Sequence, residues 1–146
     1  MTSAIISFEK ARRHQTSQLV QLAQVSGIQK HAWWVYYILI CCSFVYVITL
    51  PKSPKVIGFC SFIALPGVPV AYLMQIAIAP QAQGLGVGSR LLSNTLTLLK
   101  TRYRARWGFA LTFKDYVENW LQHFNFNRAM AFRNIRLLQT NLDKNL

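Results

Sequence analysis

Acidic residues are scarce in this sequence, which has four of them against sixteen lysines and arginines. The four are Glu9, Asp115, Glu118 and Asp143. The formal net charge is therefore +12, and anionic partners are expected. A nucleic acid, an anionic membrane surface and a polyphosphate cofactor all concentrate negative charge, so the charge alone does not choose among them.

Cysteine is also scarce, and its pattern excludes one class of protein. Cys41, Cys42 and Cys60 are odd in number and two of them are adjacent, which argues against the disulfide framework of a small secreted protein. The first thirty residues lack the apolar core of an export signal. We therefore expect a reducing compartment, with the cytoplasm as the default location.

Other signatures are missing as well. The sequence has no zinc-ligand spacing, no RNP-like motif and no basic zipper, so no metal site and no specific nucleic-acid module are expected. With 146 residues, 53% of them hydrophobic, the chain has the size of one domain with one core. We expect a single domain over residues 1–146, as a monomer or a homodimer.

The most ambiguous segment is the run 32–50, which contains nineteen residues without a charge. A helix of about twenty apolar residues crosses a bilayer, and Trp33 and Trp34 would suit its interface. However, residues 43–50 are rich in β-branched and aromatic residues, and a second strand-like run follows at 56–65. We favour a β-hairpin, and a small membrane-associated protein built on residues 32–50 is the less favoured alternative.

Hydrophobic periodicity predicts alternating short strands and amphipathic helices along the rest of the chain. Leu92, Leu96 and Leu99, for example, lie on one face of a helix over 89–100. The expected order is a strand at 4–8, a helix at 15–25, a short helix or loop at 32–42, strands at 43–50, 56–65 and 71–78, a helix at 89–100, a strand at 107–113, a helix at 116–124 and closing strands within 128–138.

A glycine-rich loop joins the strand at 71–78 to the following helix. Gly84, Gly86 and Gly88 alternate along it, and glycine permits positive φ and leaves no Cβ in the way of a ligand. Backbone amides at a helix N-terminus favour a diphosphate without a charged side chain. The Gly-Lys-Ser/Thr of a P-loop is absent, as is the acid of a Rossmann motif. The alternative is a turn that uses glycine for tight packing.

Residues 76–92 read Ile-Ala-Ile-Ala-Pro-Gln-Ala-Gln-Gly-Leu-Gly-Val-Gly-Ser-Arg-Leu-Leu. This segment resembles the signature of the GNAT acetyltransferases, a strand followed by Pro-x-x-Gln/Arg-x-x-Gly-x-Gly/Ala and a helix. The expected element order also resembles that family over most of the chain. The resemblance implies an α+β fold with a mixed, mostly antiparallel central sheet of six to seven strands, flanked by helices and splayed between the fourth and fifth strands.

The resemblance further implies acetyl-CoA as co-substrate. The backbone of residues 76–78 would bond the pantetheine arm, the amides of residues 83–89 would hold the pyrophosphate, and Ile78 is nearest to an oxyanion-stabilising amide. The implied cofactor-binding residues are Ile76, Ala77, Ile78, Gln83, Gly84, Leu85, Gly86, Val87, Gly88, Ser89 and Arg90.

The implied reaction is direct transfer of an acetyl group to an amine. Many relatives carry a Glu on the fourth strand, where this chain has Gln75, and a general-acid Tyr where it has Leu121. Tyr116 and His123 are the nearby candidates for a proton donor. The alternative is a non-catalytic relative that binds coenzyme A.

The acceptor is expected to be a small-molecule or peptide amine. The aromatic segment 32–37 falls where the family often shapes its acceptor pocket. Trp33, Trp34 and Gln75 are therefore the expected pocket residues.

A basic cluster follows the helix at 89–100. It comprises Lys100, Arg102, Arg104 and Arg106. The cluster is either a solvated helix end or a patch for a nucleotide 3′-phosphate or an acidic substrate.

Overall fold

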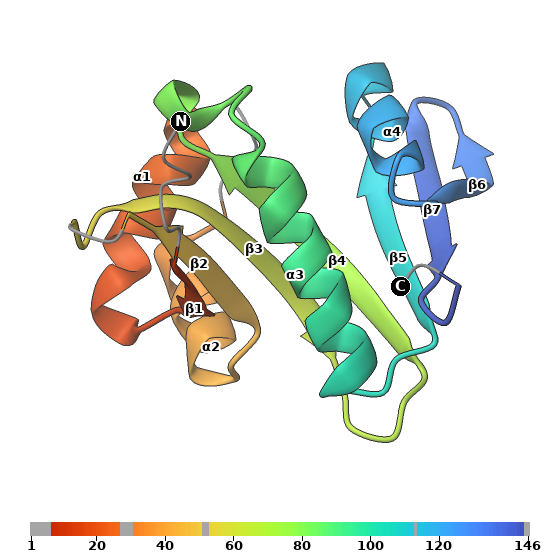
Figure 1. Ribbon diagram of the computed structural model, residues 1–146, viewed down its shortest axis with the longest axis horizontal. Helices are drawn as coiled ribbons and strands as arrows, with labels where there is room; N and C mark the ends of the chain where they lie inside the picture. Colours follow the sequence, from red (N-terminus) through yellow and green to blue (C-terminus); the bar gives the residue numbers. More distant parts are fainter. Residues whose placement is uncertain (1–6, 27–30, 51–52, 113, 145–146) are drawn as a thin grey trace. The chain divides into compact units, whose positions relative to one another are not determined.

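The computed structural model describes residues 7–26, 31–50, 53–112 and 114–144, whose elements follow one another along the chain as Figure 1 shows. The strands are β1 (Ser7–Lys10), β2 (Val45–Thr49), β3 (Val56–Ala64), β4 (Val70–Ile78), β5 (Trp107–Thr112), β6 (Asn127–Phe132) and β7 (Ile135–Asn141). The α-helices are α1 (Thr16–Val25), α2 (Trp33–Cys41), α3 (Val87–Thr101) and α4 (Asp115–Gln122), and the short 3₁₀ helices are η1 (Arg13–Gln15) and η2 (Pro80–Ala82).

The strands form one sheet in the order β1-β2-β3-β4-β5-β7-β6. Its ladders are mostly antiparallel, but β4 and β5 run parallel and pair from Val70 with Trp107 to Leu73 with Ala110. The expected α+β fold with a mixed sheet of six to seven strands is confirmed. The expected splay beyond the β4–β5 ladder stays a prediction.

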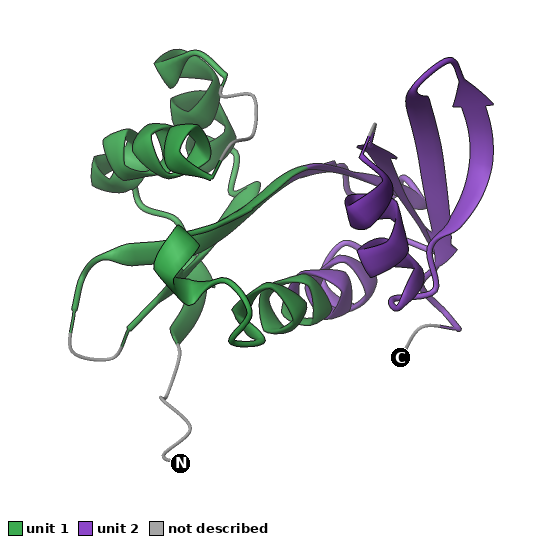
Figure 2. Cartoon of the chain, turned by 90° about the horizontal axis from the view of Figure 1, so that it is seen from above, with its two compact units in different colours: residues 1–61, 75–94 green, residues 62–74, 95–146 purple. Residues whose placement is uncertain are grey.

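The chain divides into two compact units, coloured separately in Figure 2. Unit 1 comprises residues 1–61 and 75–94, and unit 2 comprises residues 62–74 and 95–146. Within unit 1, α1 and α2 lie on one face of the strands and the first part of α3 lies on the other (Figure 2). Whether the chain is one domain stays a prediction.

Each unit has an apolar core built from its own strands and helices. In unit 1, β2 is buried along its whole length, as expected for a strand covered on both faces. Leu91 and Leu92 of α3 are fully buried in the same unit. In unit 2, the fully buried side chains include Phe62, Leu99, Phe126, Leu138 and Leu142.

The ambiguous run 32–50 folds as two elements. The short helix expected there is α2, and Ser43, with φ of 64°, lies between it and β2. The strand β2 then pairs antiparallel with β3, which confirms the hairpin. Across the described ranges, no helix combines the length and the apolar character that crossing a bilayer requires.

The other boundaries differ from the predicted ones by a few residues. The helix expected at 89–100 begins earlier, at Val87, and its Leu92, Leu96 and Leu99 are buried as expected. The first strand runs to Lys10, and its predicted start at residue 4 lies outside the described residues. Residue 113, the predicted end of the fifth strand, also lies outside them.

Gly58 of β3 permits a close approach within unit 1 that sequence analysis missed. An added Cβ would lie 2.8 Å from Cδ1 of Ile78, 3.3 Å from the carbonyl oxygen of Ala77 and 3.6 Å from Cδ2 of Leu91. A side chain at this position would therefore collide with the end of β4, while its distance to Leu91 of α3 is an ordinary contact. An isolated glycine inside a strand pattern is the signal for such an approach.

Replacing Gly58 tests this contact. We expect Gly58→Val to lower the free energy of unfolding by about 1–3 kcal/mol, because the new side chain overpacks the site. The measurement is the midpoint of urea unfolding. The matched control is Ser61→Ala on the same strand, since the Ser61 hydroxyl is buried and has no hydrogen-bond partner among the described residues. An unchanged midpoint for Gly58→Val would contradict the packing.

Candidate functional site

The connection between β4 and α3, which we call the glycine loop (residues 83–88), has a backbone that requires glycine. Gly84 and Gly86 have φ of 79° and 80°, a conformation that L-residues with a side chain rarely adopt. No atom lies within 4 Å of a Cβ added at either position. These two glycines therefore border open space, as expected for a surface that a ligand approaches, whereas Gly88 lies inside α3.

The amides of the glycine loop are available for an anion. The α3 ladder starts with the Arg90 N–H, which donates to the Gly86 carbonyl oxygen at 3.1 Å. Within the described ranges, the N–H groups of residues 84–89 have no backbone acceptor. The first four N–H groups of a helix lack intrahelical partners and carry the positive end of its dipole. The geometry fits a diphosphate held by backbone atoms.

The end of β4, before the glycine loop, is held by three hydrogen bonds. The Ile78 carbonyl oxygen accepts from the Ser26 hydroxyl (3.0 Å) and from Nε2 of Gln83 (3.1 Å). The next amide, that of Ala79, donates to the Ile57 carbonyl oxygen (2.8 Å). Sequence analysis missed Ser26, because a hydroxyl in a helix-terminal segment carries no signal for a partner so far along the chain.

Gln75 of β4 bonds to a buried tyrosine. The Tyr36 hydroxyl donates to Oε1 of Gln75 at 2.8 Å and accepts from the His31 N–H at 3.2 Å. Burial raises the pKa of Tyr36 and outweighs the lowering effect of these two hydrogen bonds. The phenol is therefore neutral near pH 7 and serves as the donor. Tyr36 is a site residue that the sequence analysis did not single out.

The two tryptophans expected beside Gln75 lie elsewhere on α2. The Trp33 ring stacks on Tyr37 with the ring centroids 5.2 Å apart, and its Nε1 donates to the Ser17 hydroxyl at 3.4 Å. Trp34 is 62% exposed. The structure thus places Tyr36 against Gln75 and leaves both tryptophans on the exposed side of the helix. Their role in an acceptor pocket stays a prediction.

The expected proton donors lie on the exposed side of α4 in unit 2. Tyr116 is 68% exposed, and the Lys114 ammonium lies 5.7 Å from its ring centroid. His123 follows the helix, and its Nδ1 lies 2.8 Å from the Asn119 carbonyl oxygen. Nδ1–H is thus the donor to that carbonyl, which leaves Nε2 of a neutral ring as an acceptor.

A hollow of about 390 Å³ adjoins His123. It is shallow, wide open to solvent and lined by Asn119, Gln122 and His123, so the imidazole lies on an open surface. Leu121, which occupies the position of the family's tyrosine, is buried and belongs to the core.

The two acids of α4 form ion pairs. Arg128 donates from Nε to Oε2 of Glu118 (3.1 Å) and from Nη2 to Oε1 (2.7 Å). These hydrogen bonds lower the pKa of Glu118 and outweigh the raising effect of burial. Asp115 pairs with Nη2 of Arg136. The buried Glu118 carboxylate therefore ties α4 to β6, whereas the pair of the exposed Asp115 lies at the surface.

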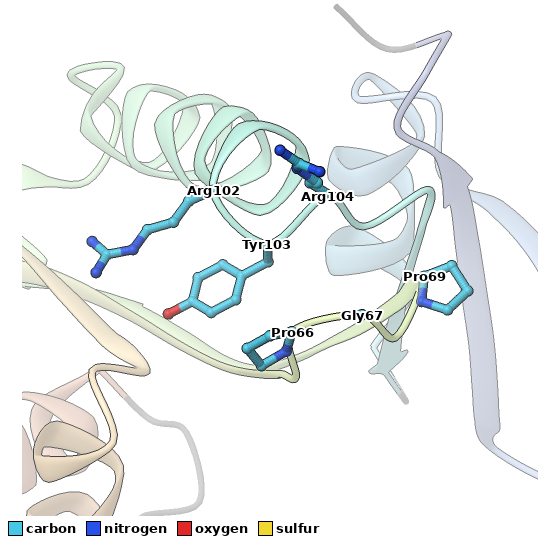
Figure 3. A pocket seen from close by; sticks show the side chains of 6 residues that line it. All are labelled: Pro66, Gly67, Pro69, Arg102, Tyr103 and Arg104. Carbon is cyan, nitrogen blue, oxygen red and sulfur yellow. The ribbon is translucent and has the colours of Figure 1, made fainter.

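The basic cluster lies beside the β3–β4 turn in unit 2. A pocket of about 420 Å³ is lined by Pro66, Gly67, Pro69, Arg102, Tyr103 and Arg104, with Tyr103 between the two arginines (Figure 3). Arg104 has φ of 55°, and the Ala105 N–H donates to the Leu99 carbonyl oxygen at 3.0 Å. This bond spans six residues and closes the chain just beyond the end of α3, where Arg104 adopts the left-handed conformation. Both interpretations of the cluster stay open.

The structure thus combines a mixed sheet with a strand, β4, that leads through a glycine loop into the N-terminus of a helix. Backbone amides in such an arrangement can hold an anion. The sequence model of the acetyltransferase (GNAT) family matches residues 10–126. The chain belongs to the GNAT acetyltransferase family.

Solved structures have the same fold at low sequence identity. The ribosomal-protein-S18-alanine N-acetyltransferase from Escherichia coli superposes with a TM-score of 0.80 at 14% identity, covering 94% of both chains. Ard1 from Thermoplasma volcanium gives 0.80 at 15% identity, covering 93% of this chain and 97% of its own. The PaiA N-acetyltransferase from Thermoplasma acidophilum, in complex with coenzyme A, gives 0.78 at 12%, covering 93% and 98%. No curated protein sequence matches the chain.

The Glu118–Arg128 pair makes stability depend on pH. A carboxyl whose folded pKa lies below its ordinary 4.5 stabilises the fold above that value, and the contribution is lost as pH falls through the folded pKa. We expect Glu118→Gln to lower the urea midpoint at pH 7, with the difference from the unmodified protein shrinking below pH 4.5.

The control for this variant is Asp143→Asn, which breaks the exposed pair with Arg106. We expect little change there, because exposed ion pairs contribute about 0–1 kcal/mol. A Glu118→Gln difference that is equal at pH 3 and pH 7 would contradict the assignment.

Proposed function

We propose that this protein is an acyl-CoA-dependent N-acyltransferase that transfers an acetyl group from acetyl-CoA to an amine. The observation that carries the proposal is the glycine loop, in which Gly84 and Gly86 hold positive φ and the amides before Arg90 lack backbone acceptors. The loop lies within the part of the sequence that matches the GNAT family.

The cofactor would be held mainly by backbone groups. The amides of residues 84–89 fit the pyrophosphate, and Arg90 supplies the first positive side chain after the loop. Along β4, the backbone of Ile76 and Ala77 is proposed for the pantetheine arm, since the Ile78 carbonyl oxygen already accepts two hydrogen bonds. Acetyl-CoA supplies the activated acyl group for direct attack by an amine.

Proton transfer would depend on groups other than carboxylates and on solvent. Gln75 has no ionisable proton, and the α4 carboxylates are engaged by Arg128 and Arg136. The Tyr116 hydroxyl, and Nε2 of His123 when that nitrogen also carries a proton, are the proposed donors to the departing thiolate, and both residues are exposed to solvent. Orientation of the two substrates would then supply much of the rate.

The acceptor proposed here is a small-molecule or peptide amine. Three of the four carboxylates are already in ion pairs, with Arg106, Arg128 and Arg136. A polycationic acceptor such as a polyamine therefore finds few groups to bind its charges, whereas a single peptide amine needs only a neutral site. Among the similar structures, the NatC complex was crystallised with a Gag peptide and CoA.

A second candidate is a GNAT relative that binds coenzyme A without turnover. The observation that favours it is the side chain of Gln75, which cannot act as a general base. Its amide oxygen accepts a hydrogen bond from the Tyr36 hydroxyl. Binding without acetyl transfer to any amine would support this candidate over the first.

Substitution in the glycine loop tests cofactor binding. We expect Gly86→Ala to weaken acetyl-CoA binding at least about tenfold, since a Cβ strains the φ of 80° and enters the space that the pyrophosphate would occupy. Isothermal titration calorimetry measures the affinity.

The matched control for this variant is Gly67→Ala, which has φ of 81° and equally open surroundings but lies in the β3–β4 turn. Gly67 also lines the pocket of Arg102 and Arg104, so we expect the control to bind acetyl-CoA normally, at a similar cost in stability, if that cluster is a solvated helix end. Equal affinity of the two variants, or no binding by the unmodified protein, would refute the cofactor assignment.

Kinetics test the proposed proton donors. We expect Tyr116→Phe or His123→Gln to lower kcat by about 10²-fold with little change in acetyl-CoA affinity, because a general acid acts in the transition state. The measurement is acetylation of a peptide library followed by mass spectrometry, with kcat determined over a range of pH. An unchanged kcat and pH profile for both variants would exclude them as donors.

A further inference from the structure

The helix α2 has an exposed face without a charged side chain. With about 3.6 residues per turn, positions 33, 37 and 41 form one row and positions 34 and 38 the neighbouring row. This outer face of α2 comprises Trp33, Trp34, Tyr37, Ile38 and Cys41. Trp33 is 49% exposed in the first row, and Trp34 is 62% and Ile38 50% exposed in the second, so the face is open to solvent across both rows.

Such a face is unusual on a helix of a globular protein. The inner side of α2 contributes Tyr36, Leu39 and Ile40 to the core of unit 1. The solvent side of a packed helix ordinarily carries charged or polar residues, and a helix that is hydrophobic all round is ordinarily covered on all sides. The outer face of α2 therefore indicates a surface that another apolar surface covers.

The surroundings of α2 are basic. The helix packs against η1 and α1, and Arg12, Arg13 and His14 are exposed at or just before η1. Neither η1, α1 nor α2 contains an acid. An occupant of this surface must therefore combine an apolar layer with negative charge.

We propose that the outer face of α2 and the arginines at η1 bind the surface of an anionic lipid bilayer. Tryptophan and tyrosine concentrate at the boundary between headgroups and acyl chains, and each nearby arginine gains from anionic lipid. The helix has nine residues, too few to cross a bilayer, so it would lie on the surface.

Charge argues against a second copy of the chain as the occupant. Each copy carries a net charge of +12, and a contact through α2 would bring the Arg12 and Arg13 regions of two copies together. Like charges of this size oppose self-association. The proposal goes beyond the acetyl-transfer function and does not depend on it.

Vesicle binding tests the proposal on the full chain without acetyl-CoA. We expect co-sedimentation with vesicles of phosphatidylcholine and phosphatidylglycerol, much less with phosphatidylcholine alone, and weakening at high salt. Brominated acyl chains should quench tryptophan fluorescence, which reports insertion. The double variant Trp34→Ser/Ile38→Ser should bind at least about tenfold more weakly, and Arg12→Gln/Arg13→Gln should lose the preference for anionic lipid.

The matched control is Phe132→Ser, which removes a 69% exposed aromatic side chain from β6 in unit 2. It should bind vesicles as the unmodified protein does. The proposal is overturned if neither vesicle type binds, or if the α2 variants and the control lose binding equally. It is also overturned if sedimentation equilibrium shows a dimer that Trp34→Ser/Ile38→Ser dissociates without any vesicle binding.

Discussion

The candidate site of this protein depends on how closely β3 approaches the end of β4. Gly58 leaves room for the Ile78 side chain above it, and the Ile57 carbonyl oxygen holds the Ala79 amide at 2.8 Å. The Ser26 hydroxyl donates a hydrogen bond to the Ile78 carbonyl oxygen. The glycine loop therefore starts from a strand end that is fixed in position before a ligand arrives. A backbone anion site needs this preorganisation, because amides that must first be ordered lose part of their binding free energy.

The acidic residues of α4 are engaged in ion pairs within the fold. Glu118 and Asp115 join α4 to the two closing strands through Arg128 and Arg136. The pair with Arg128 lowers the pKa of Glu118, which leaves this carboxylate poorly suited to accept a proton. The proposed acetyl transfer would therefore rely on positioning of the two substrates and on donors other than carboxylates. Because acidic residues are scarce, the surface is strongly cationic. This charge favours the anionic ligands that are proposed for the glycine loop and for α2.

The sequence predicts features that depend on neighbouring residues and misses those that depend on distant ones. The glycine loop is local, because its glycines and the leucines of α3 lie within one stretch of chain. The burial of the leucines is confirmed, and positive φ is found at Gly84 and Gly86 but not at Gly88. The hydrogen bond between Tyr36 and Gln75 joins residues 39 positions apart. Neither residue type, taken from the sequence, indicates the other as its partner. The extent of α2 was also uncertain, because a helix that is apolar on all sides has no periodicity to distinguish it from a buried strand. Gly58 was detectable as a lone glycine in a strand and was overlooked.

The outer face of α2 ends in a cysteine whose thiol can be modified chemically. Cys41 is a free, exposed thiol in the same row as Trp33 and Tyr37, the adjacent Cys42 is also free and exposed, and Cys60 is buried in β3. Alkylating reagents reach a thiol only where solvent does, so the rate of modification at Cys41, followed separately from that at Cys42, measures how completely this face is covered. Cys60 supplies an internal reference for unfolding. Alkylation of the native cysteines therefore reports whether the outer face of α2 is covered, and no label has to be added to the protein.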